Sequence, residues 1–150
     1  MVCLPLLNFS GRMPLAGGQA YGCLPLPTPT VSIASSSSGA ESVATKKVVL
    51  TLSAASALNV TVPFSLSGTA TVGVGADYTA TSSPVTILAG QTKTTITLTI
   101  NNDSLDEANE TVVITLGTPT NAGLGTPSSS TYTINEIGRA SCRERASNRA

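Results

Sequence analysis

Hydrophobic and polar residues alternate one by one along residues 96–100 and 112–116. Successive side chains of a β-strand point to opposite faces, so a period of two predicts a strand with one buried face. The first stretch places Ile96, Leu98 and Ile100 on one face and threonines on the other. Residues 102–110 between the two stretches carry four carboxylates. We therefore expect two half-buried strands joined by an acidic connection.

Five further stretches read as short strands: residues 29–34, 47–53, 58–66, 85–87 and 131–135. The alternation is longest in 58–66, where Leu58 and the four apolar residues that follow it in alternation are expected to point inward. Pro63 in this stretch cannot donate a ladder hydrogen bond, which predicts an edge or a bulge. Residues 35–39 (SSSSG) are expected to form a flexible turn.

The number and length of these stretches define the fold class. Seven short strands are separated by frequent turn signals, and no stretch shows a helical period. This combination predicts an all-β fold, a seven-stranded antiparallel β-sandwich. A chain of 150 residues is long enough for one such domain with a core.

Both ends of the chain differ from the middle. Residues 1–28 mix Leu and Pro (VCLPLL, CLPLP) and lack the pattern of a signal peptide, so we expect an irregular leader or linker. Residues 136–150 have no apolar period, and their run EIGRASCRER resembles the translation of a short-read sequencing adapter. This predicts a disordered, artefactual tail, with a natural basic tail as the alternative. The domain itself is expected to span residues 29–135.

Composition and charge narrow the functional classes. The chain has no His, the commonest general base, and few aromatic residues (3%). Between residues 29 and 135 three lysines stand against six carboxylates, and the resulting net charge of −3 argues against nucleic acid and suits a cation. Cys3, Cys23 and Cys142 lie outside this segment and form no disulfide framework. No apolar run is long enough to span a bilayer, so no direct membrane insertion is expected.

The acidic residues between positions 103 and 110 allow two interpretations. Like charges at a strand end repel one another unless they are solvated, protonated or bound to a cation. A solvated turn would keep a strand edge from aggregating, whereas a ligand set would hold a metal, although the Gly and donor spacing of an EF-hand are missing. Asp77, in a glycine-rich stretch, either caps a turn through nearby backbone N–H groups or joins the ligands.

An enzyme is not expected. A Ser or Thr nucleophile needs a neighbouring base, and the chain offers neither a His nor a suitably placed Lys. Asp106 and Glu110 could act as paired carboxylates on a sugar, but they share one short loop that has no aromatic platform nearby. The scarcity of aromatic residues also counts against a carbohydrate-binding sandwich.

Several motifs follow one another in a characteristic order. They are PTVSI at 29–33, Glu41 ten residues ahead of TLS, GTAT at 68–71, DYTAT at 77–81, AGQT at 89–92, and NDSLDEANETVVITL at 102–116. The order resembles that of the Calx-beta domain over residues 29–135. The resemblance implies a seven-stranded immunoglobulin-like sandwich. In calcium-sensing members of that family, several calcium ions are held at one end of the sandwich.

Carried over by position, the resemblance implies one set of calcium ligands: Glu41, Asp77, Asp103, the carbonyl of Leu105, Glu107 and Glu110. Calcium takes about six to eight oxygens, so this set suits one or two ions. Asn102 stands where calcium-sensing members have an acid, and the acidic run after the last strand is reduced to Asn135 and Glu136. These differences imply a weaker site with fewer ions. The long loop before Asp77 leaves its placement open.

The leading hypothesis is a calcium-binding β-sandwich repeat module of a large extracellular or cell-surface protein, with a structural or adhesive role. Its partners would be Ca²⁺ ions and neighbouring repeat domains of a longer chain. The alternative is a metal-free structural spacer domain of an adhesin. The calcium hypothesis requires Glu41, Asp77 and the acidic residues between 103 and 110 to meet at one end of the sandwich, since opposite ends would exclude a shared site.

Overall fold

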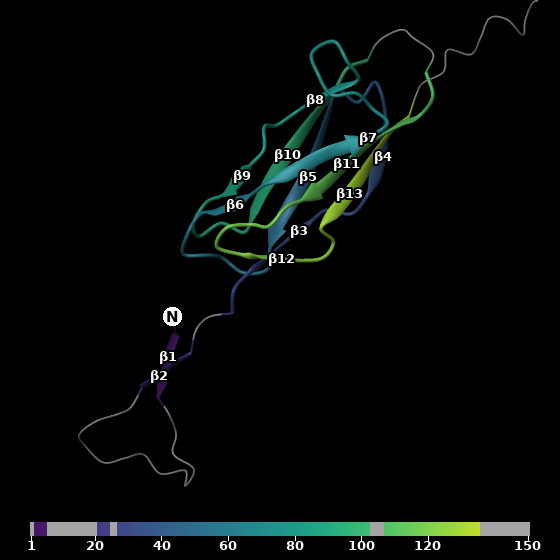
Figure 1. Cartoon of the computed structure of the whole chain (residues 1–150). Coiled ribbons are helices and arrows are strands. Elements are labelled where there is room, and N and C mark those ends of the chain that lie inside the picture. The colour runs from purple at the N-terminus through teal and green to yellow at the C-terminus, as the bar shows by residue number, and fades with distance from the viewer. Residues whose placement is uncertain (1, 6–20, 25–26, 103–106, 136–150) are drawn as a thin grey trace, which may run out of the picture.

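The computed structural model describes residues 2–5, 21–24, 27–102 and 107–135 (Figure 1). Within these residues every regular element is a β-strand, and the strands form stacked sheets. The predicted all-β sandwich is therefore confirmed. No helix in the described part of the chain has the length and apolar character needed to cross a membrane.

The larger sheet has five strands, in the order β12-β3-β5-β10-β8. Its strands are β12 (Gly123–Leu124), β3 (Thr30–Ile33), β5 (Thr45–Leu52), β10 (Lys93–Ile100) and β8 (Tyr78–Ala80). At its centre β5 and β10 pair antiparallel from Lys93 opposite Thr51 to Thr99 opposite Thr45. The two longest strands therefore hold the middle of this sheet in a single register.

The second sheet has four strands, in the order β4-β13-β11-β7. Its strands are β4 (Ser37–Ala40), β13 (Ser129–Asn135), β11 (Glu110–Leu116) and β7 (Phe64–Gly68). A separate pair joins β6 (Val60–Val62) to β9 (Val85–Ile87). Most pairs are antiparallel, as predicted, but β12 runs parallel to β3 and β4 runs parallel to β13.

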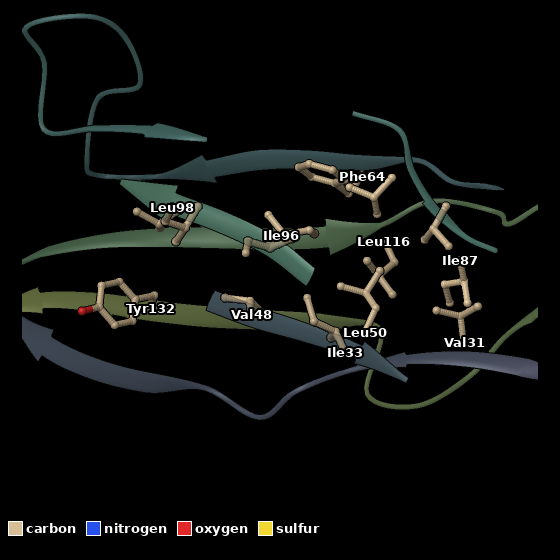
Figure 2. Close-up of a cluster of buried hydrophobic side chains, with 14 of the residues drawn as sticks. Val31, Ile33, Val48, Leu50, Phe64, Ile87, Ile96, Leu98, Leu116 and Tyr132 are labelled. Carbon is tan, nitrogen blue, oxygen red and sulfur yellow. The ribbon is translucent and has the colours of Figure 1, made fainter. Parts of the chain in front are cut away.

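Alternation along each strand builds the core between the layers. Residues on one face of β5 and of β10 are buried in the order predicted, with Leu50, Ile96 and Leu98 completely inaccessible to solvent. Figure 2 shows this cluster with Tyr132 at one end and Val31 and Ile87 at the other. A buried Leu or Ile contributes about 1.5–3 kcal/mol relative to an exposed one, so this shared apolar layer is what holds the sheets together.

The stretch predicted as one strand over residues 58–66 is two strands in different sheets. Pro63 separates β6, which pairs with β9, from β7, which pairs with β11. The proline has no N–H to donate, and its carbonyl accepts from the backbone N–H of Gly117 at 2.8 Å. The chain therefore changes sheets where its ladder is weakest. Leu58 was expected to point inward, and this is wrong, because it is 60% exposed.

Five other strands differ from expectation. Residues 37–39 were predicted to lie in a turn, but they form the start of β4 and pair with β13. The Ser-rich sequence has no alternation of its own, so the pairing with β13 fixes which residues lie opposite one another. The short strands β8 (YTA) and β12 (GL) were not predicted, because neither has two large aliphatic residues in alternation, as β9 has in Val85 and Ile87. Within residues 1–28, β1 (Val2–Pro5) and β2 (Tyr21–Leu24) pair antiparallel, which the Leu and Pro pattern did not predict.

The connections gather at two ends of the sandwich. Residues 41–44, 69–77 and 107–109 lie at one end, which we call the acidic end. Residues 53–59, 88–92 and 117–122 lie at the other, where the chain runs into β3, and we call it the entry end. Figure 1 shows β8 near the first end and β12 near the second. The first and last strands of the sandwich thus begin and finish at opposite ends.

Tyr132 carries a polar atom inside the core. Its side chain is buried, and its hydroxyl has no hydrogen-bond partner among the described residues. Gly39 of β4 makes room for it, because a Cβ at that position would collide with the hydroxyl oxygen. The Lys46 Nζ lies 5.4 Å from the ring centroid, within the range of a cation–π interaction. Burial of the Tyr132 hydroxyl therefore lowers the stability of the folded protein, because no hydrogen bond compensates for its lost hydration.

Tyr132→Phe is expected to leave the protein as stable as the wild type or more stable, by about 1 kcal/mol, because it removes a buried unpaired hydroxyl and keeps the ring. Gly39→Ala is expected to destabilise the wild type more than it destabilises the Tyr132→Phe variant. Urea unfolding of the two single variants and the double variant measures this coupling. Equal effects of Gly39→Ala in both backgrounds would contradict the contact.

Candidate metal centre

Three carboxylates meet at the acidic end. Oxygen atoms of Asp77, Glu107 and Glu110 all lie within 4.8 Å of one another. Asp77 and Glu110 are partly buried, and Glu107 is exposed. Asp77 ends the loop between β7 and β8, Glu107 lies three residues before β11, and Glu110 is the first residue of β11. Two connections, each of which joins one layer of the sandwich to the other, thus supply one cluster.

Asp77 is held by the loop that it closes. Its Oδ2 accepts a hydrogen bond from the backbone N–H of Thr71 at 2.5 Å. The N–H of Gly73 donates to the carbonyl of Tyr78 at 2.9 Å, and the N–H of Tyr78 donates to the carbonyl of Thr71 at 3.3 Å. Asp77 therefore does cap a turn, one of its two predicted roles, and the same turn directs its carboxylate toward the other acids.

The start of this loop is fastened to β11 beside Glu110. The N–H of Thr111 donates to Thr69 Oγ1 at 2.8 Å, and the N–H of Ala70 donates to the carbonyl of Thr111 at 3.1 Å. Gly68 has a φ of 124°, and a Cβ there would collide with the Thr111 carbonyl. A glycine is therefore required for the chain to approach β11 this closely.

The end of the loop is fastened to the chain that leaves β10. The backbone N–H of Asn101 donates to the carbonyl of Asp77 at 2.9 Å, and its side-chain amide donates to the carbonyl of Ala76. Sequence reasoning did not single out Thr69, Thr111 or Asn101. Their role depends on contacts between residues 24 to 42 positions apart, which no local pattern reveals.

Glu41 lies at the same end but outside the group of three. It is a buried residue, 7% exposed, and its backbone N–H donates to the carbonyl of Asn135 at 3.0 Å. Asn135 follows Ile134, which pairs with Glu110. The calcium hypothesis requires Glu41, Asp77 and the acidic connection to lie at one end of the sandwich. The described residues of this set do so. Asp103 and Leu105 fall outside the described residues, so their predicted roles stay predictions.

The donor set suits calcium. Calcium binds oxygen at about 2.3–2.6 Å, so two ligand oxygens on opposite sides of one ion are about 4.6–5.2 Å apart. Carboxylate oxygens within 4.8 Å of one another can therefore share an ion with little rearrangement. Three carboxylates that each bind through one oxygen supply fewer ligands than the six to eight that calcium takes, so backbone carbonyls and water would complete the shell.

Tyr78, next to Asp77, is a second titratable group at this end. It is buried at the start of β8. Burial raises the pKa of the Tyr78 hydroxyl above its usual value of 10.0, and the negative charge of Asp77 raises this pKa further. Burial also raises the pKa of Tyr132. Both phenols therefore keep their protons at a pH where an exposed tyrosine ionises.

A family model and several solved structures match the chain. The model of the Calx-beta domain matches residues 28–138. The apo form of the Calx CBD1 domain is 14% identical with a TM-score of 0.60, covering 71% of this chain and 97% of that one. The Calx CBD2 domain is 12% identical with a TM-score of 0.58, covering 81% and 95%. At these identities, the structures show a shared fold.

Larger fragments match as well. The calcium binding domain CBD12 of CALX1.1 is 17% identical with a TM-score of 0.62, and the match covers 71% of this chain and 44% of that one. The corresponding fragment of CALX1.2 is 16% identical with a TM-score of 0.58, and again 44% of it is covered. The chain thus spans less than half the length of these fragments. No curated protein sequence matches the chain.

The raised pKa of Tyr78 predicts a loss of stability in alkali. The unfolded chain ionises its tyrosines near pH 10, whereas the folded chain keeps the Tyr78 proton to higher pH. The free energy of unfolding is therefore unaffected by this group below about pH 10 and falls as the pH rises above it. Denaturant unfolding between pH 8 and 12 should show this fall, and Tyr78→Phe should reduce it.

Asp77→Asn is the matched test of the charge contribution, because the asparagine carbonyl can still accept from Thr71. It should reduce the alkaline fall by less than Tyr78→Phe, since burial is the larger cause of the shift. If wild type and Tyr78→Phe lose stability in parallel above pH 10, Tyr78 is not the group responsible.

Proposed function

The chain belongs to the Calx-beta domain family, and from this membership we propose that it binds calcium at Asp77, Glu107 and Glu110. Asp103, the carbonyl of Leu105 and Glu41 are the further ligands expected from the family resemblance. The observation that carries the proposal is the convergence of three carboxylates, from two connections, to within 4.8 Å. Like charges this close favour a bound cation, which removes their mutual repulsion.

In this proposal the domain acts as a mechanical module and carries out no reaction. Calcium would join the loop before β8 to the connection before β11, and these two strands belong to different sheets of the sandwich. One ion would thereby stiffen the acidic end, where the chain continues beyond Asn135. The role is that of a repeat in a longer chain, and the neighbouring repeats are its partners.

We further propose that the parent protein is extracellular or attached to the cell surface. Asn102 stands where calcium-sensing members of the family have an acid, and Glu107 is exposed, both of which favour weak binding. Extracellular calcium modules typically bind with Kd values of about 10⁻⁴–10⁻³ M, which matches the calcium concentrations met outside cells. A site this weak would stay empty in a compartment with submicromolar calcium, so the expected affinity fits the proposed location.

Calcium titration of the full chain tests the proposal. Calorimetry is expected to show saturable binding, with a Kd of about 10⁻⁴–10⁻³ M. Thermal unfolding should shift upward with added calcium, because a ligand at 100 times its Kd stabilises the folded state by about 2.7 kcal/mol. Asp77→Asn and Glu107→Gln should each weaken binding at least tenfold, since each removes one charged ligand.

Two controls make the result specific. Glu144→Gln makes the same chemical change outside the family match and should bind calcium as the wild type does. Magnesium at equal concentration should shift unfolding less, because it demands a tighter octahedral shell. The calcium proposal fails if calcium gives neither heat nor a shift in melting temperature, and the domain is then a metal-free spacer.

A further inference from the structure

The exposed large apolar side chains of the domain lie at its two ends. Six are exposed among the described residues: Val43, Val72 and Val74 at the acidic end, and Leu58, Leu88 and Leu124 at the entry end. The outward faces of the two main sheets carry mainly Thr, Ser and Lys instead. Apolar surface that gathers on opposite ends of a domain suits contacts made end to end.

The valines of the acidic end stand on a braced loop. Val74 is fully exposed and Val72 is 54% exposed. The N–H of Ala76 donates to the carbonyl of Gly73, and Gly75 has a φ of 78°, which turns the chain back toward Asp77. The hydrogen bonds to Asp77 and Asn101 hold both arms of the turn. The loop is thus a fixed apolar projection, which would lose little entropy on docking.

The entry end has a hollow of matching character. An open groove of about 550 Å³ is lined by Pro27, Pro29, Ala57, Leu58, Asn121 and Ala122, among others. Its walls are braced: the Asn121 side-chain amide donates to the carbonyl of Asn59 at 2.9 Å, and the N–H of Ala89 donates to the Asn59 side chain at 2.9 Å. The groove is therefore a formed apolar surface with room for small side chains such as valine.

Charge also distinguishes the two ends. The described carboxylates, namely Glu41, Asp77, Glu107 and Glu110, all lie at the acidic end. Lys46 and Lys47, at the start of β5, also lie near this end, so two lysines stand against the four carboxylates and its described charges sum to −2. The entry end has Lys93 at the start of β10 and no described carboxylate. The acidic end of one domain and the entry end of another therefore attract, whereas two acidic ends repel. Repulsion likewise disfavours an anionic membrane as the partner of the valine loop.

We propose that the Val72–Val74 loop of one domain docks, head to tail, in the groove beside Pro27 and Ala122 of a second copy of the domain. The chain enters the sandwich beside the groove and leaves it at the acidic end, so consecutive repeats present these two surfaces to each other. The repeat context rests on the proposed function, but the contact itself requires no bound ion. In a longer chain a short linker raises the effective concentration to the millimolar range, so a weak contact suffices.

Two complementary variants test the contact. Val72→Ser with Val74→Ser removes the apolar loop tip without changing charge, and Ala57→Gln fills the groove. Sedimentation and NMR titration of the wild-type chain should show weak concentration-dependent association near 0.1–1 mM, as expected of a contact that works at millimolar effective concentration. Each variant alone should associate at least tenfold more weakly. A head-to-tail contact is restored when the two variants are mixed, because one supplies an intact loop and the other an intact groove.

The mixture is read most directly with one partner labelled. ¹⁵N-labelled Ala57→Gln chain, titrated with unlabelled loop variant, should shift amide signals at residues 72–76 and leave the groove signals unchanged. Val43→Ser and Leu88→Ser remove exposed apolar residues at the same two ends, outside loop and groove, and should change association less than twofold. Well-dispersed spectra establish that each variant is folded. If the double loop variant does not fold, the single variant Val74→Ser replaces it.

Three results would overturn the contact. The first is no association of the wild type at 1 mM. The second is loss of association in the loop variant together with full association of Ala57→Gln, which indicates loop-to-loop pairing. The third is binding of the valine loop to vesicles of phosphatidylserine and phosphatidylcholine without self-association. Repeating the titration in EDTA separates the two proposals, because calcium binding without contact refutes only this inference, and contact without calcium binding refutes only the calcium site.

Discussion

The alternation of apolar and polar residues along β5 and β10 is the constraint on which the rest of the structure depends. Each strand buries one face, so each sheet has one apolar side, and the two apolar sides must cover each other. Once the strands span the core, the longer connections lie at one end or the other. Polar residues in connections far apart in sequence then become neighbours, as Asp77 and Glu110 do.

Most of the fold could be predicted from this period of two, because the buried face of each strand requires an apolar residue at every second position. What could not be predicted depends on partners. Residues 58–66 show an unbroken alternation, yet the chain changes sheets at Pro63, because β9 and β11 offer separate edges to the two halves. Leu58 continues the pattern but lies past the strand, exposed. The Ser-rich β4 exists because β13 pairs with it.

The candidate site likewise has a part that the sequence predicts and a part that depends on contacts between distant residues. Glu107 and Glu110 stand in one acidic run, so sequence alone places them together, and the family resemblance adds Asp77. Their actual proximity depends on the Thr69–Thr111 contacts and on Gly68, where only a glycine lets the chain approach β11. The turn that holds Asp77 also supports the exposed Val74. One short loop thus links the acidic cluster to the apolar surface beside it.

The parallel pairing of β4 with β13 has a consequence for a chain under tension. Ser37 to Ala40, near the start of the sandwich, run alongside Tyr132 to Asn135 at its finish, in the same direction. Force applied between the two termini pulls these strands past each other along their length, so all the hydrogen bonds between them are loaded together in shear. They cannot open one after another, as a zipper does. The pairing of β4 with β13 therefore resists extension along the axis that joins the start and the finish of the sandwich.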